Sequence, residues 1–103
     1  MAKAEIFSGA CGFKAVVEAE MDGRICRLDI KSECDAIQML ASELNEVDPY
    51  NEIVFRGKLP RTLELGTRYC AHSACPVPSG IIKAIEIAAG LNLPVDVYIK
   101  LSK

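Results

Sequence analysis

The chain has 103 residues, half of them hydrophobic, and its 12 basic and 14 acidic residues leave a net charge of −2. A chain of this length is expected to form a single domain, residues 1–103, and to bury about two-thirds of the surface of its unfolded form. No run of basic residues is present, which argues against nucleic acid as a partner, because phosphate binding needs a concentrated basic surface. The first residues do not resemble a signal peptide and no apolar segment approaches the length of a membrane span, so we expect a cytoplasmic protein without a membrane partner.

Three strands are predicted near the start of the chain, because apolar and polar residues alternate there with the period of a half-buried strand. They comprise residues 3–7, 13–21 and 24–31. A small loop, residues 8–12, separates the first two, and Asp22-Gly23 is typical of a two-residue hairpin turn between the second and the third. The sequence therefore predicts a three-stranded antiparallel meander.

Helices are predicted after the meander. Ser32 is expected to cap a helix, with Asp35 completing a variant of the capping box and an apolar stripe that extends to Val47. Residues 50–69 are less regular: residues 52–55 suggest a short extended piece, and Pro60 is expected to open a helix that ends near Tyr69.

The last helix is predicted to open at Pro76 and Pro78 and to end at Gly90, which suits the left-handed position after a helix. Residues 95–101 alternate again and predict a final strand. The predicted fold class is α+β: a three-stranded antiparallel meander followed by helices packed on one face, with a C-terminal strand.

Five cysteines are present: Cys11, Cys26, Cys34, Cys70 and Cys75. An odd number does not suit a complete disulfide framework, and the reducing cytoplasm keeps thiols free. Packing, metal binding and thiol chemistry remain as interpretations.

The order of the predicted elements brings four of these cysteines to one end of the sheet. Successive strands alternate in direction, so the loop with Cys11 and the end of the third strand with Cys34 lie at the same end. The last helix must begin there too if it is to lead into a final strand, which adds Cys70, Cys75 and the only histidine, His72. Cys26 is expected at the opposite end, facing the core, and is interpreted as a packing residue.

Thiolates with an imidazole are ligands that suit a soft metal or an iron–sulfur cluster. Cys34 and Cys75 are predicted at helix N-termini, where unpaired N–H groups and the helix dipole favour the thiolate. Within one segment, Cys70-x-His72-x2-Cys75 is a zinc-like spacing, although it lacks the paired Cys-x2-Cys form of zinc ribbons.

Two stretches resemble the iron–sulfur cluster assembly scaffolds of the IscU and NifU N-terminal type. They are GACGFKAVVEAEMDGRICRLDIKSEC, residues 9–34, and HSACPVPSGIIKAIEIAAG, residues 72–90. The resemblance implies an IscU/NifU-like fold with Cys11, Cys34 and Cys75 as thiolate ligands and His72 as the counterpart of the family's histidine. It also implies recipient or sulfur-donor proteins as partners.

This sequence departs from that family at three places. Phe13 stands where an aspartate usually helps to release the cluster, two residues separate His72 from Cys75, and Cys70 is an additional thiol. The stretch CPVPSGIIKAIEIAAGL also resembles one in small proteins of anaerobic prokaryotes for which it implies no activity.

The favoured hypothesis is a protein that binds an iron–sulfur cluster, or alternatively zinc, rather than an enzyme. Its expected ligands are Cys11, Cys34, Cys75 and either Cys70 or His72. A thiol-dependent enzyme with Cys34 or Cys75 as nucleophile, and a metal-free interaction module whose cysteines only pack, are the alternatives. The final strand, as a sheet edge, also allows a homodimer.

Overall fold

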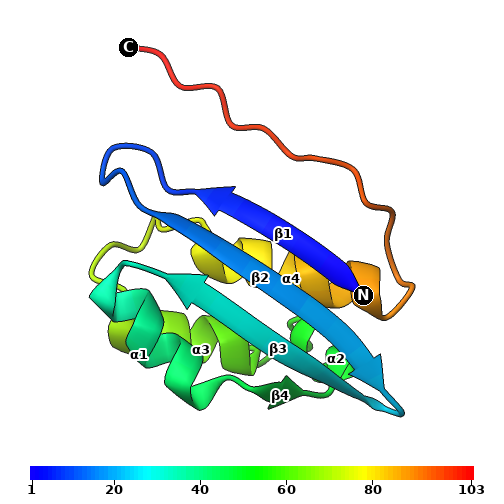
Figure 1. The fold of residues 1–103 in the computed structure, drawn as a ribbon. Helices are drawn as coiled ribbons and strands as arrows, with labels where there is room; N and C mark the ends of the chain where they lie inside the picture. Colours follow the sequence, from blue (N-terminus) through cyan, green and yellow to red (C-terminus); the bar gives the residue numbers. More distant parts are fainter.

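The alternating segments at the start of the chain form an antiparallel sheet in the computed structural model, which describes all residues 1–103 (Figure 1). The sheet has four strands in the order β1-β2-β3-β4, and the structure as a whole is an α+β fold. Its strands are β1 (Ala2–Phe7), β2 (Lys14–Asp22), β3 (Ile25–Ser32) and β4 (Glu46–Val47), and its helices are α1 (Asp35–Glu43), α2 (Pro49–Glu52), α3 (Arg61–Tyr69) and α4 (Val77–Ala88).

The predicted meander is confirmed, with its hairpin turn displaced by one residue. Asp22 pairs with Ile25, so Gly23 and Arg24 are the central turn residues. Gly23 has φ +64°, a conformation that glycine adopts without strain. The apolar face of β2 is buried as expected, with Ala15, Val17 and Ala19 fully inaccessible.

The first long helix is shorter than predicted. It begins at Asp35 with Cys34, not Ser32, in the N-cap position, and it ends at Glu43. Val47 belongs to β4, where it pairs with Cys26. A residue that continues a helical stripe also fits a buried strand position, and pairing with β3 decides between the two.

The middle of the chain also differs in part from the prediction. Residues 49–52 form the short helix α2, so the extended piece predicted at residues 52–55 is wrong. The carboxylate of Glu52 is buried and accepts hydrogen bonds from the N–H groups of Arg61 (3.2 Å) and Thr62 (2.8 Å) and from the Thr62 hydroxyl (2.6 Å). Since these N–H groups lie in the first turn of α3, Glu52 fixes the start of that helix, directly after the predicted Pro60.

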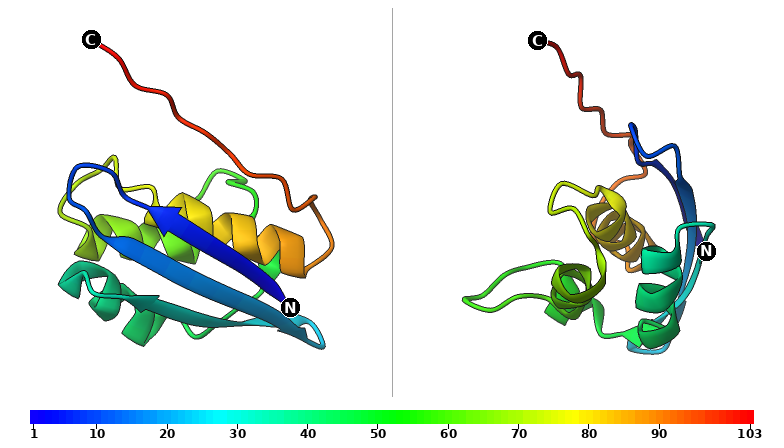
Figure 2. Two further views of the ribbon diagram at one scale, coloured as in Figure 1. Left: turned by 45° about the horizontal axis from the view of Figure 1, so that its top comes forward. Right: turned by 90° about the vertical axis from the view of Figure 1, so that its left-hand side faces the viewer.

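The last helix begins with Pro78 in its first turn, and Gly90 follows it at φ +73°. Both observations confirm the predicted helix signals. The strand predicted at residues 95–101 is wrong: no helix or strand follows α4, and the chain runs extended away from the body (Figures 1 and 2).

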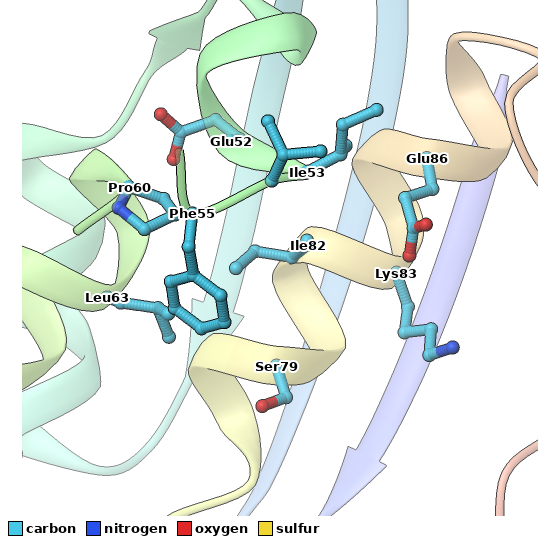
Figure 3. A pocket seen from close by; sticks show the side chains of 10 residues that line it. Glu52, Ile53, Phe55, Pro60, Leu63, Ser79, Ile82, Lys83 and Glu86 are labelled. Atoms are coloured by element: carbon cyan, nitrogen blue, oxygen red, sulfur yellow. The ribbon is translucent and has the colours of Figure 1, made fainter. Parts of the chain in front are cut away.

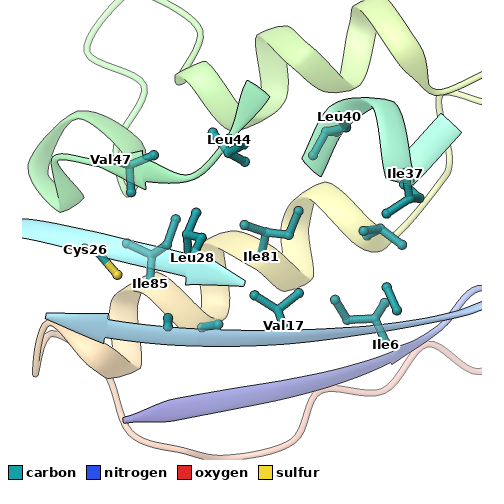
Figure 4. Close-up of a cluster of buried hydrophobic side chains, with 14 of the residues drawn as sticks. Ile6, Val17, Cys26, Leu28, Ile37, Leu40, Leu44, Val47, Ile81 and Ile85 are labelled. Atoms are coloured by element: carbon teal, nitrogen blue, oxygen red, sulfur yellow. The ribbon is translucent and has the colours of Figure 1, made fainter. Parts of the chain in front are cut away.

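The helices lie on one face of the sheet in two layers (Figure 2). α4 packs on β1 and β2, α1 packs on β3, and α3 packs on both of these helices. Figure 4 shows the resulting core, in which Leu40, Ile81 and Ile85 meet the buried face of the sheet. None of the helices has the length and apolar character that crossing a membrane requires.

Glycine permits the closest contact between the layers. A Cβ placed on Gly80 would lie 2.4 Å from Cδ1 of Ile6, so the absence of a side chain lets α4 lie directly against β1. This packing sets the position of the α4 N-terminus at the end of the sheet where the cysteine-bearing loops lie.

Candidate thiol site

Three cysteines occupy the ends of three different helices at one end of the molecule. Cys34 is the N-cap of α1, Cys70 follows the last residue of α3, and Cys75 lies immediately before Pro76, the N-cap of α4. All three are half-buried, reduced and in contact with the edge of the hydrophobic core. We call Cys34, Cys70 and Cys75 the thiol cluster.

The position of Cys34 follows from the end of the meander. The Ser32 hydroxyl accepts a hydrogen bond from the Cys34 N–H (3.2 Å) and donates one to the carbonyl of Lys14 on β2 (2.8 Å). The amide of Gln38 donates to the Ser32 carbonyl (2.9 Å). The turn from β3 into α1 is therefore held against the sheet. No side chain caps the first turn of α1, so its N–H groups remain available to an anion at Cys34.

The positions of Cys70 and Cys75 follow from the loop between α3 and α4. The Cys70 N–H donates to the carbonyl of Gly66 (2.9 Å), and the Cys75 N–H donates to the carbonyl of His72 (3.2 Å). Gly66 also lets the two helices approach, since a Cβ there would lie 3.1 Å from Cγ of Pro78. A short loop between two close helices brings both thiols to the same place.

The electrostatics of Cys70 show that the three thiols interact. Burial, then the neighbouring Cys75 and finally Cys34 raise the pKa of Cys70 from its ordinary 9.0 to about 11. Two thiolates repel each other and a thiolate is poorly solvated in a partly apolar site, so the protonated form is favoured. The position of Cys70 at the carboxyl end of α3, the negative end of the helix dipole, acts in the same direction.

The other two expected ligands lie at the same end of the molecule but outside the cluster. Cys11 is exposed in the loop between β1 and β2, where Gly9 and Gly12 have φ +83° and +77°. His72 is exposed in the loop between α3 and α4. In the positions that the side chains occupy, no group of three or more His, Cys, Asp or Glu residues could hold a metal ion.

Cys26 is a packing residue away from the other four cysteines, as the sequence predicts. It is fully buried and contributes to the core from β3 (Figure 4). Burial raises the pKa of its thiol, which is the behaviour of a structural cysteine.

Comparison with known proteins assigns the chain to a protein family. Residues 2–101 match a family of unknown function, DUF6951. The chain belongs to the DUF6951 family. The match spans all five cysteines as well as most of the extended C-terminal segment. No curated protein matches the chain, and no solved structure matches it.

A second feature of this DUF6951 chain was not predicted from the sequence. A hollow of about 220 Å³ lies between α4 and the segment that connects α2 to α3 (Figure 3). Phe55, Leu63 and Ile82 line it, with Lys83 and Glu86 at its border. Its volume is below the range of about 300–1,000 Å³ typical of small-molecule sites, and it contains none of the cysteines.

Proposed function

We propose that the protein binds a soft metal centre, an iron–sulfur cluster or alternatively zinc, through Cys34, Cys70 and Cys75. The observation that supports this proposal is the electrostatic interaction of three free thiols contributed by three helix ends. Cysteines that serve only in packing, such as Cys26, have no need to be near one another.

The surroundings of the thiols suit an anionic site. Cys34 and Cys75 lie where α1 and α4 begin, so two helix dipoles direct their positive ends toward the same region. Backbone N–H groups at such positions can donate to the sulfurs of a bound iron–sulfur cluster, which tunes the reduction potential of the cluster.

A cation also resolves the mutual repulsion of the thiols. In the metal-free protein Cys70 keeps its proton to a higher pH than an ordinary thiol, first because the site is partly buried and then because ionised Cys75 and Cys34 would repel its thiolate. A metal would replace that proton and allow all three sulfurs to be anionic, so binding is expected to release protons and to strengthen as the pH rises.

The fourth ligand would come from one of two exposed groups. Cys11 lies in a loop with two glycines in left-handed conformations, and His72 lies between Cys70 and Cys75 in sequence. Either would need to move to join the cluster, and the three thiols would also need to turn toward a common metal, because no three of these side chains could hold one as they stand. Four ligands complete the usual coordination of zinc and of iron–sulfur clusters.

A resident centre with one exposed ligand suits transfer to or from another protein. We propose that the molecule is a cluster scaffold or carrier with an IscU/NifU-like arrangement, that it acts in the cytoplasm, and that its partners are sulfur-donor or recipient proteins. The exposure of Cys11 favours this function over a permanently closed structural site.

The test is metal and acid-labile sulfide analysis of protein purified without oxygen. We expect the wild-type protein to contain iron and sulfide and to show cysteine-to-iron charge-transfer absorption. Each of the variants Cys34→Ser, Cys70→Ser and Cys75→Ser should lose most of the bound iron and sulfide and most of this absorption. Cys26→Ala is the matched control and should retain the centre, because Cys26 lies outside the cluster.

Two more variants identify the fourth ligand. If Cys11→Ser lowers the bound iron and His72→Ala does not, Cys11 completes the site, and the reverse result assigns His72. Zinc without sulfide would retain the site and exclude the cluster. A protein with neither metal, even after reconstitution with iron and sulfide or with zinc, would refute the proposal.

A further inference from the structure

The C-terminal segment, residues 91–103, has the sequence of a strand without a sheet to join. Val95, Val97, Ile99 and Leu101 alternate with Asp96, Tyr98 and Lys100. The four aliphatic side chains are 65–88 % exposed, and residues 95–103 form no helix or strand. A seven-residue pattern of this kind fits a half-buried strand, so its exposure indicates that the surface that covers it belongs to another molecule.

The same molecule has a sheet edge without a strand. β1 pairs only with β2, and no strand lies on its other side. The Ser8 N–H donates to the Phe13 carbonyl (3.0 Å), and Ser8 continues the β1 register. Since antiparallel ladders alternate, the backbone groups of Lys3, Glu5 and Phe7 point to the free edge and are available to a further strand.

The hinge between α4 and this segment directs the segment away from its own β1. The Leu91 N–H donates to the Glu86 carbonyl (2.9 Å), and the Val95 N–H donates to the Leu93 carbonyl across Pro94 (2.8 Å). The segment makes no backbone hydrogen bond with β1, and it runs past that strand and out of the body (Figures 1 and 2). A short, hydrogen-bonded hinge with a proline is the kind of connection that favours strand exchange between copies.

We propose that residues 95–101 of one copy add as a fifth strand to the β1 edge of a second copy, and that the exchange is reciprocal. Each free strand then pairs with the free β1 edge of the other copy, which closes a twofold dimer in which the added strand becomes the new edge of each sheet.

The side chains of the two strands are compatible with this pairing. Ala2, Ala4 and Ile6 face the core side of β1, so the aliphatic face of the added strand would continue the apolar layer beside α4. The outer side of β1 carries Lys3 and Glu5, and the polar face of the segment carries Asp96 and Lys100, so each charge has a partner of opposite sign available.

The test is the molar mass of the full chain, measured by light scattering with reductant and a chelator present so that neither disulfides nor metals link the copies. We expect a dimer of twice 11.2 kDa. Deletion of residues 95–103 should give a folded monomer that keeps its helical far-UV circular dichroism signal, since all four helices end before this segment. The double variant Val97→Lys, Ile99→Lys should weaken dimerisation by about 100-fold or more.

A pair of edge variants tests the partner strand. Glu5→Pro removes a free-edge N–H while leaving the β1–β2 ladder intact, and it should dissociate the dimer; Glu5→Gln keeps the N–H and should not. A full-length chain that is monomeric in light scattering refutes the proposal. This holds whether hydrogen exchange shows the amides of residues 95–101 to be unprotected or protected by pairing with β1 of the same chain. A dimer that survives both the deletion and Glu5→Pro refutes it as well, because the interface then lies elsewhere.

Discussion

Removal of Cys75 is expected to make Cys70 easier to ionise. Burial, Cys75 and Cys34, in that order, raise the pKa of Cys70 from 9.0 to about 11. At a pH below both values, two pKa units mean that Cys70 has about 100-fold less thiolate than an ordinary cysteine. In Cys75→Ser the neighbouring sulfur no longer repels the thiolate, so we expect the pKa of Cys70 to fall toward 9.0 while remaining above it, because burial persists.

The assay is the rate of iodoacetamide labelling of each cysteine in the metal-free protein, measured by mass spectrometry between pH 7 and pH 12. The midpoint of the pH–rate profile reports the pKa, whereas accessibility changes only the height of the profile. Cys34→Ser should produce a smaller decrease than Cys75→Ser, since Cys34 is the smaller cause. Cys26→Ala, in the core of the sheet, is the control and should leave the Cys70 midpoint unchanged.

The same shift has a consequence for stability. Because the folded protein binds the Cys70 proton more tightly than the unfolded chain does, the stabilisation is fully present below pH 9 and is lost as the pH rises through about 11. A two-unit shift corresponds to about 2.7 kcal/mol at full strength, and we expect about 1 kcal/mol because solvent screens a half-buried group. A Cys70 midpoint at or below that of an ordinary thiol, or one that Cys75→Ser does not lower, would refute the thiol cluster as described.

Further predictions concern the scaffold and the metal. Gly80→Ala should destabilise the fold by about 1–3 kcal/mol in urea unfolding, because the new Cβ would meet Cδ1 of Ile6 at 2.4 Å. Ser79→Ala, on the exposed side of the same helical turn, is the control and should change the stability by less than about 0.5 kcal/mol. Equal effects of the two substitutions would contradict the packing of α4 on β1. Glu52→Ala should cost about 1–3 kcal/mol, because it leaves the first-turn N–H of Thr62 buried without an acceptor, and wild-type stability in that variant would contradict the role of Glu52. Cobalt(II) titration at pH 6.5 and pH 8.5 should give tighter binding and thiolate charge-transfer absorption at the higher pH; binding that is independent of pH would exclude Cys70 as a ligand.

The local pattern of the sequence was sufficient for most elements. Alternation predicts the meander, and proline and glycine predict both ends of α4, because these residues constrain the backbone of their own position. The prediction of secondary structure failed where one residue fits both a helical and a strand pattern. Val47 continues a helical stripe, yet it pairs with Cys26 across the sheet.

The C-terminal segment shows a different limit. Residues 95–101 have a clear strand pattern, but a strand also needs a neighbour with free backbone groups, and alternation carries no information about which edge is within reach. The hinge at residues 90–94 decides that this segment does not pair with its own β1.

For the candidate site, the alternating direction of the first three strands placed Cys11 and Cys34 at one end of the molecule. The α3–α4 loop with Cys70, His72 and Cys75 was placed there because a final strand was expected after α4; the loop does lie at that end (Figure 1), although the strand is absent. The tertiary structure decided which of these residues interact: Cys34, Cys70 and Cys75 form a cluster, while Cys11 and His72 remain exposed. The physical reason is that side-chain proximity depends on how closely α3 and α4 approach and how α4 lies on β1, and these distances are set by packing at Gly66 and Gly80 rather than by any local pattern.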